Sequence, residues 1–287
     1  MLARQNSIQV IARKFATMPG RGGRGGGRGP LPRNVQVSKQ ISWLLRHGAE
    51  QEGLKLDANG FLGVEEVLNN RKVRSLKVTF DELRDIVEDN DKQRFTMIPK
   101  SGADSVEEAE AAKASDKPQD YLIRANQGHS LKVESEGLLK PITSENAPST
   151  AVHGTTHAAW PRIVASGGLK PMTRNHVHFA SGLPSGFQAL ADTGDATVEA
   201  PVISGMRKSS TVLMFLDVAK AMEAGLKLWI SDNGVILSEG NAEGLIPLEG
   251  FKRVEDRTGE GVLLEDGKVI KTAPASWEAK GKGRGKG

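Results

Sequence analysis

Apolar residues in the first third of the chain recur at the three- and four-residue spacing of amphipathic helices. Between Ser38 and Gly48 this spacing predicts a helix that Ser38 caps and Gly48 ends, so order is expected to begin near Val35. A second short helix is expected at residues 64–70. The capping box Thr79-Phe80-Asp81-Glu82 opens a third helix.

Alternation of apolar and polar residues then predicts two strands, at residues 93–98 and 121–124. Residues 100–120 between them are rich in Glu, Asp, Ala, Ser and Lys, so we expect a disordered acidic insertion at the tip of a hairpin. Three small helices followed by a hairpin are typical of a winged helix, a shape that holds nucleic acid.

The second half of the chain contains short runs of β-branched residues, separated by glycine turns and by helical pieces at residues 158–166 and 218–224. Residues 262–270 predict a hairpin around Asp266-Gly267. The other strand-like runs are residues 151–152, 176–179, 212–217, 228–230 and 235–237. Because their spacing is too irregular for a doubly wound sheet, the expected fold class is α+β.

Charge is segregated along the chain, although the net charge is only +4. The first 49 residues contain nine Lys and Arg and no acid, residues 280–287 add four cations, and the body between them is acidic. Residues 19–31 and 280–287 are too rich in glycine and cations to bury apolar surface, so we expect both to be disordered. Such segments bind nucleic-acid phosphates without sequence preference, or serve only as solubilising tails.

Composition excludes several classes of protein. The absence of cysteine excludes disulfides, a thiol nucleophile and thiolate metal sites. No apolar run approaches the ~20 residues of a transmembrane helix. A Gly-x-Gly-x-x-Gly pattern starts at Gly20, but it has no strand before it and no helix after it, so it does not indicate a dinucleotide-binding fold. Residues 1–18 resemble a mitochondrial transit peptide, with a frayed basic arm as the alternative.

Arg46 and His47 are adjacent polar residues at the end of the first predicted helix. Cations at this position complement the helix dipole, but Arg also offers a bidentate fork to phosphate and His can transfer a proton. Arg94 points outward on its strand, where a surface role is the simplest interpretation. The histidines lack the spacing of a zinc motif, and neither a Gly-x-Ser-x-Gly nor a Walker motif is present. We therefore expect no metal site, serine hydrolase or P-loop.

Longer motifs resemble those of the KptA-type RNA 2′-phosphotransferases. The blocks follow the family's order across residues 38–250, and their joint occurrence is very specific although each alone is weak. They are Ser38-Lys39, Leu44-Leu45-Arg46-His47-Gly48-Ala49, Gly53-Leu54, Asn59-Gly60-Phe61, Lys92-Gln93-Arg94-Phe95, Ile123-Arg124-Ala125-Asn126-Gln127-Gly128-His129-Ser130, His153-Gly154-Thr155, Gly168-Leu169-Lys170-Pro171-Met172, Arg174-Asn175-His176-Val177-His178-Phe179 and Ser231-Asp232-Asn233-Gly234-Val235-Ile236-Leu237.

The resemblance implies an enzyme that removes the 2′-phosphate left at a tRNA splice junction, with NAD as co-substrate and no metal. In this family the RNA phosphate attacks the ribose carbon that bears nicotinamide, which leaves. The neighbouring 2″-hydroxyl then attacks phosphorus and releases 2′-hydroxyl RNA and ADP-ribose 1″,2″-cyclic phosphate. Guanidinium groups suit this chemistry, because a 2′-phosphomonoester is nearly dianionic and phosphorus accumulates charge during the transfer.

The resemblance also implies an N-terminal winged-helix RNA lobe at residues 35–144, which includes the 100–120 insertion, and an ADP-ribosyltransferase-type NAD lobe at residues 145–272. Residues 1–34 would be a disordered basic head and residues 273–287 a basic tail. The boundary near residue 145 agrees with the change in pattern found from the residues alone.

The family's functional residues fall on matching positions of this sequence. The catalytic set is Arg46, His47, Arg94 and Arg174. Cofactor binding is expected from His153, Gly154, Thr155, His178, Ser231, Gly234 and Val235. RNA binding is expected from Arg124, Asn126, Gln127 and His129. His47 would protonate the departing RNA oxygen or hold the phosphate as a cation.

Some alternatives stay open at this point. His176 and His178 point the same way from one strand, and either could face NAD or be a buried structural histidine. Residues 124–129 could contact RNA or join the two lobes. The same NAD lobe could instead transfer ADP-ribose to other RNA ends or to protein, or it could be inert in an Arg-Gly RNA-binding protein. We expect a monomer without membrane contact, in the nucleus or cytoplasm, or in mitochondria if residues 1–18 direct import.

Overall fold

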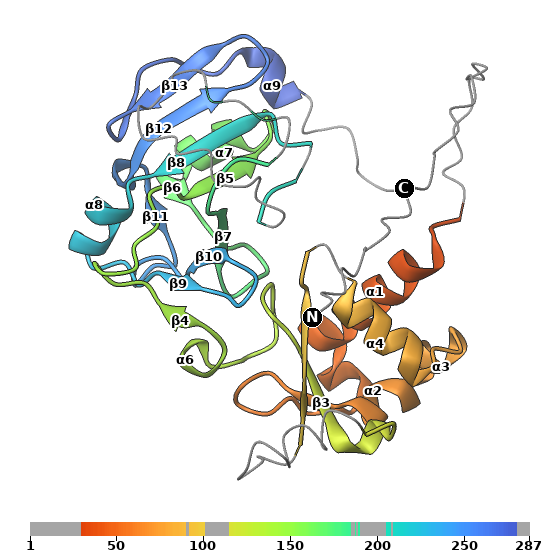
Figure 1. Cartoon of the computed structure of the whole chain (residues 1–287). Helices are drawn as coiled ribbons and strands as arrows, with labels where there is room; N and C mark the ends of the chain where they lie inside the picture. The colour runs from red at the N-terminus through yellow and green to blue at the C-terminus, as the bar shows by residue number, and fades with distance from the viewer. Residues whose placement is uncertain are drawn as a thin grey trace, which may run out of the picture. The chain divides into compact units, whose positions relative to one another are not determined.

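The computed structural model divides the chain into two units, Met1–Pro32 and Arg33–Gly287. It describes residues 30–89, 92–100, 115–184, 187, 189, 205–207 and 209–279. The predictions for the Arg/Gly-rich head, for residues 101–114 of the acidic insertion and for residues 280–287 therefore lie outside the described residues. Figure 1 shows the order of the helices and strands in the second unit.

The first helix starts earlier and ends differently than the sequence pattern predicts. It begins at Arg33, so Ser38 lies inside the helix and is not its cap. The Arg33 guanidinium ties the first turn to Glu82 through bonds of 2.7 and 2.9 Å. Gly48 does not end the helical path, which turns only at Gly53, where φ is +73°. The path consists of α1 (Arg33–Trp43), the π-helix η1 (Leu44–Gly48) and the 3-10 helix η2 (Glu50–Glu52).

Three further helices complete the N-terminal half of the unit, namely α2 (Val64–Asn69), α3 (Arg71–Ser75) and α4 (Phe80–Glu88). The sequence predicted α2 and α4 but missed α3. Thr79 caps α4, because its Oγ1 accepts a hydrogen bond from the Glu82 amide at 3.2 Å. The Glu82 carboxylate accepts from Arg33, so the predicted capping box is only half formed.

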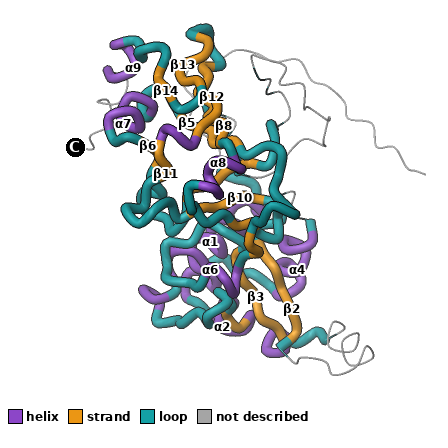
Figure 2. Tube along the Cα trace, turned by 90° about the vertical axis from the view of Figure 1, so that its left-hand side faces the viewer, coloured by secondary structure: helices purple, strands orange, loops and turns teal. Residues whose placement is uncertain are grey.

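A three-stranded antiparallel sheet packs on these helices, in the order β1 (Leu62–Gly63), β3 (Tyr121–Ala125), β2 (Phe95–Pro99). The predicted hairpin is confirmed by the β2–β3 pair, whose strands lie side by side in Figures 1 and 2. The sheet and helices share a core that runs from Val37 to Leu131 in sequence.

The acidic insertion is ordered at its C-terminal end, contrary to the prediction for residues 100–120. Pro118–Asp120 forms the 3-10 helix η3, and the Lys100 amide donates to the Asp120 carbonyl at 2.7 Å. Asp116 pairs with Arg84 of α4 at 3.1 Å. The segment from Ser115 onward is therefore part of the fold.

The C-terminal half is built on a nine-stranded sheet whose neighbouring strands pair antiparallel throughout the described residues, as expected for an α+β fold without a doubly wound sheet. In spatial order its strands are β14 (Lys268–Val269), β13 (Gly261–Glu265), β12 (Phe251–Asp256), β8 (Val212–Leu216), β5 (Val152–Thr155), β7 (Val177–Ala180), β10 (Val235–Ser238), β9 (Trp229–Ile230) and β4 (Lys140–Pro141).

A second hydrophobic core contains residues from Ile142 to Trp277. In it the helices α7 (Trp160–Ala165) and α8 (Val218–Glu223) pack against this sheet. Smaller elements complete the half, namely α6 (Ser135–Leu138), the pair β6 (Gly168–Leu169) with β11 (Ile246–Pro247), and the 3-10 helix η4 (Leu248–Gly250). The Asp-Gly hairpin is confirmed by β13 and β14, with φ of +45° at Asp266 and +81° at Gly267.

The segment predicted as a basic tail from residue 273 begins inside the fold. Helix α9 (Ala275–Ala279) carries Trp277, which is 4% exposed and belongs to the second core. The Trp277 ring stacks on His157 with centroids 4.0 Å apart. Within the described residues no helix is long and apolar enough to cross a membrane.

Candidate active site

The π-helical turn that follows α1 presents Arg46 and His47. Leu44, Leu45 and Gly48 in the same turn are buried, while Arg46 and His47 are half-buried. A Cβ at Gly48 would collide with the Trp43 ring, so glycine allows the turn to close on that side chain. π-helical turns occur frequently at functional sites, because they project side chains out of the regular helix spacing.

The segment that follows β3 is hydrogen-bonded to this turn. Both Ser130 and Leu131 donate their amides to the Arg46 carbonyl, at 3.0 and 3.2 Å. Gly128 has φ of +89°, and a Cβ there would lie 3.5 Å from Arg46 Nε. The Arg46 side chain therefore borders the space that a side chain at Gly128 would occupy.

His47 is oriented by Ser130. Its Nδ1 lies within hydrogen-bond distance of Ser130 Oγ, at 2.8 Å. Burial, followed by the charges of Arg46 and Arg174, lowers the pKa of His47 below its usual value. The free protein therefore favours the neutral imidazole, with Nε2 left to face a reactant.

Arg46 carries its charge under strong desolvation. Burial, followed by the charges of Arg174 and Arg94, lowers its pKa to about 10. Its Nε and Nη2 are buried without a hydrogen-bond partner. The pKa of Arg174 is lowered too, by partial desolvation of its guanidinium and then by the charge of Arg207. The structure thus brings the predicted residues Arg94 and Arg174 within electrostatic range of Arg46, a concentration of donors that suits a multiply charged anion.

Arg174 is exposed, and its neighbour Asn175 attaches this part of the chain to the segment after β3. The Asn175 amide donates to the His129 carbonyl at 3.0 Å, and its Nδ2 donates to the Leu131 carbonyl at 2.8 Å. Asn175 was not among the predicted site residues, although it lies inside the block that contains Arg174.

Two of the residues expected to bind RNA are buried, and a third is half-buried. Asn126 and His129 are 4% and 2% exposed, and Gln127 is half-buried. Burial, then the charges of Arg46, His176, His47 and Arg124, lowers the pKa of His129 to about 3, and its Nε2 has no partner. His129 therefore lies beside Arg46 as a neutral side chain inside the protein, which corrects its assignment to an RNA-facing surface.

Arg124 joins segments of the fold. Its guanidinium pairs with Asp232 at 2.8 Å and lies 4.7 Å from the centroid of the Phe61 ring. Only 12% of its side chain is exposed. Of the two interpretations left open for Arg124, the lobe-joining one fits these contacts.

The turn between β9 and β10 contains the predicted residues Ser231, Gly234 and Val235. Ser231 Oγ donates to Asn233 Oδ1 at 2.7 Å, and Gly234 has φ of +74°. Asn233 Nδ2 donates to the Lys92 carbonyl at 2.9 Å, two residues before Arg94. The turn therefore contacts the backbone that leads into β2.

The histidines of β5 and β7 are connected. His153 Nδ1 donates to the His178 carbonyl at 2.8 Å, which fixes the proton on Nδ1. His178 Nε2 is buried without a partner, and burial, followed by the charges of Arg174, His176, His153 and Arg46, lowers the pKa of His178 to about 3. His176 Nε2 instead lies 3.0 Å from Ser135 Oγ and 3.3 Å from Glu239. Of the two candidates, His178 is the one beside the arginines with an unused ring nitrogen.

Gly154 and Thr155 serve packing in this structure. A Cβ at Gly154 would collide with Ser210, and it would lie 2.5 Å from Met206 Cγ. Thr155 is 9% exposed, and its carbonyl accepts from the Thr211 amide at 2.9 Å.

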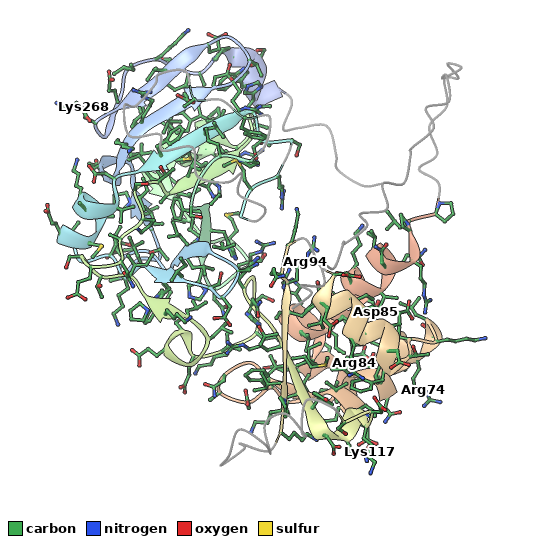
Figure 3. The ribbon with its side chains drawn as sticks, viewed as in Figure 1. Arg74, Arg84, Asp85, Arg94, Lys117 and Lys268 are labelled. Carbon is green, nitrogen blue, oxygen red and sulfur yellow. The ribbon has the colours of Figure 1, made fainter. Side chains whose placement is uncertain are left out.

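A cavity of about 620 Å³ opens beside the π-helical turn. Arg46, His47 and Arg94 line one part of it, and residues of α1, of α4 and of the segment after α4 line the rest. Figure 3 labels Arg94 at one end of the β2–β3 pair and Lys117 at the other. Among the described residues, no group of three or more His, Asp or Glu side chains is placed to hold a metal ion.

Comparison with known proteins decides the family. The sequence model of the "RNA 2'-phosphotransferase, Tpt1 / KptA family" matches residues 32–240. The chain belongs to this family. The KptA family match begins one residue before α1 and ends two residues after β10, so it spans the π-helical turn, the arginines and the histidine-bearing strands.

Relatives of the KptA family resemble the chain over most of its length. The "tRNA 2'-phosphotransferase 1" of Danio rerio is 38% identical over 239 residues, which are 82% of this chain and 92% of the relative. The "tRNA 2'-phosphotransferase" of Saccharomyces cerevisiae is 37% identical over 226 residues, 77% of this chain and 84% of the relative. The human "tRNA 2'-phosphotransferase 1" is 36% identical over 231 residues, 79% of each. The chain is therefore a member of a transferase family that acts on RNA.

Proposed function

We propose that the protein is an NAD-dependent tRNA 2′-phosphotransferase, which removes the splice-junction 2′-phosphate and yields 2′-hydroxyl RNA, nicotinamide and ADP-ribose 1″,2″-cyclic phosphate. The observation that carries the proposal is the desolvated Arg46 guanidinium, whose Nε and Nη2 are buried without partners within range of Arg94 and Arg174. Donors held in this way before the substrate arrives stabilise phosphate charge without reorganisation.

The arginines and His47 have separable roles in this chemistry. Arg46 and Arg94 would neutralise the phosphate oxygens, and Arg174 would reach the phosphate from the C-terminal half. His47, held at Nδ1 by Ser130, would direct Nε2 at the RNA 2′-oxygen and protonate it as it departs. In the free protein the pKa of His47 is lowered, and a bound phosphate dianion would raise it and so favour the imidazolium that donates this proton.

NAD supplies a ribose carbon with a good leaving group, and the C-terminal half has polar groups that fit this co-substrate. His178 Nε2 is a buried polar atom without a partner, within electrostatic range of Arg174. The carbonyl of His178 accepts a hydrogen bond from His153. The turn Ser231–Val235 lies beside the backbone that leads to Arg94. These residues would hold the nicotinamide end. Gly154 contributes through backbone packing, because its Cβ position is filled by Ser210 and Met206.

The finer assignment of the fold belongs to the same proposal. The small helices with the antiparallel β1–β3–β2 sheet support a winged-helix RNA lobe, and the nine-stranded antiparallel sheet supports an ADP-ribosyltransferase-type NAD lobe. We place the boundary near residue 145. We further propose a monomer that works in the nucleus or cytoplasm, or in mitochondria if residues 1–18 direct import. Light scattering and imaging of the tagged full chain test these two points.

The test is incubation of the full chain with NAD and a 2′-phosphorylated RNA oligonucleotide, with and without a chelator. The expected result is NAD-dependent loss of the 2′-phosphate and release of nicotinamide in both cases. A matched 5′-phosphorylated oligonucleotide distinguishes the alternative enzyme, an ADP-ribosyltransferase that modifies other ends. Lasting ADP-ribosylation of the 5′-phosphorylated RNA without attack on the 2′-phosphate would overturn the proposal, and so would inactivity on both.

A further inference from the structure

Asn126 follows β3 directly and is buried, although the sequence places it among residues that could face RNA. Only 4% of the residue is exposed. Its Oδ1 accepts a hydrogen bond from Thr96 Oγ1 at 2.7 Å, and its Nδ2 donates to the Gln93 carbonyl at 2.8 Å. Both ends of the side-chain amide are therefore used inside the protein.

The backbone of Asn126 also contacts the residue between these two partners. Its amide donates to the Arg94 carbonyl at 2.9 Å. The β2–β3 ladder begins one residue later, where Phe95 pairs with Ala125. Asn126 therefore holds three positions of the neighbouring segment by hydrogen bonds. Gln93 and Thr96 bond to its side chain, and Arg94 bonds to its backbone.

The chain needs such a restraint at this point. Gln93 has φ of +45°, a left-handed conformation that is strained for a residue with a Cβ. The Asn126 amide holds the carbonyl of this strained residue, immediately before Arg94. Without it, the peptide between Gln93 and Arg94 can rotate toward an ordinary conformation and change the direction in which the Arg94 side chain leaves the strand.

We propose that Asn126 is a positioning residue for Arg94, and that it acts by holding the Gln93 carbonyl and thereby the entry into β2. This inference rests on the proposed function, in which Arg94 stabilises charge at phosphorus. Asn126 itself touches no reacting atom. Because a displacement of about 1 Å at a catalytic group can cost about 100-fold in rate, loss of this restraint should be visible in the chemistry.

The experiment compares Asn126→Ala with a matched control, Asn70→Ala. Asn70 is also a buried asparagine of the N-terminal half, 8% exposed, and its side-chain amide also makes two hydrogen bonds. In Asn70 the side-chain partner is the acceptor and the backbone partner the donor: Nδ2 donates to the Glu52 carboxylate and Oδ1 accepts from the Lys72 amide. Each variant loses comparable buried hydrogen bonds, so both should melt at a lower temperature than the original chain. A merely structural role for Asn126 would make the two variants alike in every other respect.

Single-turnover time courses with NAD and 2′-phosphorylated RNA supply the readout. Asn126→Ala should slow the second step by about 10- to 100-fold and accumulate ADP-ribosylated RNA, as expected of Arg94→Ala, whereas Asn70→Ala should leave the ratio of the two steps unchanged. In an Arg94→Ala background, Asn126→Ala should cause no further slowing, since both act through one group. Equal slowing in both backgrounds, or no change in the step ratio, overturns the proposal.

A second measurement keeps the proposal separate from the proposed function. The Arg94 Nε–H resonance, identified by its loss in Arg94→Ala, should shift in Asn126→Ala and stay in place in Asn70→Ala. An unmoved resonance overturns the inference even if the enzyme is active, and a moved resonance supports it even if the wild type proves inactive on 2′-phosphorylated RNA. If Asn126→Ala does not fold, Thr96→Val removes the donor to Asn126 Oδ1 and should give the same changes at smaller size.

Discussion

Gly128 lies against the guanidinium end of Arg46. A Cβ built on Gly128 would be 3.5 Å from Arg46 Nε and 3.6 Å from its Cζ, and the backbone there has φ of +89°. The two residues are far apart in sequence, yet a side chain at Gly128 would come into van der Waals contact with the side chain of Arg46.

Substitution of Gly128 by alanine should therefore harm both stability and catalysis. We expect a loss of about 1 kcal/mol or more in the free energy of unfolding from the positive φ, and a lower second-step rate because relaxation of that φ would move the backbone next to Arg46. Gly53→Ala is the control, because Gly53 also has a positive φ of +73° but no atom within 4 Å of its Cβ position. Equal turnover in the two variants, at equal folded fraction, would show that the placement of Arg46 does not depend on the backbone at Gly128.

Alanine substitution of Arg46, His47 or Arg94 should slow the second chemical step more than the first. Transfer of the RNA phosphate to NAD needs the phosphate to be aimed, whereas the second step needs charge stabilisation and a proton, and loss of one such donor typically costs about 10²–10³-fold. ADP-ribosylated RNA should accumulate in a gel time course. His153→Ala should suppress the first step instead. Unreacted substrate in all four variants would assign the N-terminal residues to binding alone.

Ser130→Ala should lower the rate without removing His47. The hydroxyl lies 2.8 Å from His47 Nδ1, and the loss of one such hydrogen bond of about 1 kcal/mol corresponds to roughly a fivefold slower second step. The pH dependence of the second-step rate should shift as well, because the imidazole of His47 loses the hydroxyl that orients its proton. Ser166→Ala, which removes hydrogen bonds to the carbonyls of Ile163 and Gly168, serves as the control and should leave the profile in place.

Binding of 2′-phosphorylated RNA without NAD should be coupled to proton uptake. In the free protein the pKa of His47 is lowered by burial and by Arg46 and Arg174, and a bound phosphate dianion should raise it. Affinity should therefore rise as pH falls through the pKa of the complex and level off below that of the free protein. Calorimetry in two buffers of different ionisation enthalpy measures the uptake. The same uptake in His47→Asn would assign the proton to the phosphate instead.

Removal of residues 1–32 should leave the chemistry intact on a short oligonucleotide. The truncation point follows Pro32 because Arg33 is part of α1 and pairs with Glu82. It removes six cations, so binding of long RNA should weaken and its dependence on salt should flatten. Affinities across a salt series check this prediction. Inactivity of the truncated chain on the short substrate would show that the head takes part in the fold.

The elements that the sequence predicted correctly are those with a strong local signal. The β2–β3 hairpin follows from alternation, the α4 cap from Thr79, and the β13–β14 hairpin from the Asp266-Gly267 turn. Strand β12 was missed because its sequence ends in Glu255 and Asp256, which look exposed. Both are fully buried, and Asp256 bonds to His157 at 2.6 Å across the sequence. Only tertiary partners explain such a strand.

The sequence predicted the candidate site, like the fold, only in part. The family resemblance located Arg46, His47, Arg94 and Arg174, and the structure brings Arg94 and Arg174 within electrostatic range of Arg46 and places Arg174 within range of His47. The resemblance did not distinguish residues that contact a ligand from residues that hydrogen-bond inside the protein, because the sequence of a loop does not show which partner an asparagine or arginine has. Asn126 proved to be buried, and the polar groups that use its amide are distant in sequence.

The two unpartnered nitrogens of Arg46 have a consequence for how long the protein lasts in a cell. A buried donor without a partner costs about 1–3 kcal/mol of folding free energy, more if it is charged. A phosphate that accepts from both would remove this cost and make local opening of the π-helical turn rarer. Resistance to proteases should then follow the supply of phosphorylated RNA, so that the protein persists longest where unfinished splice products are abundant.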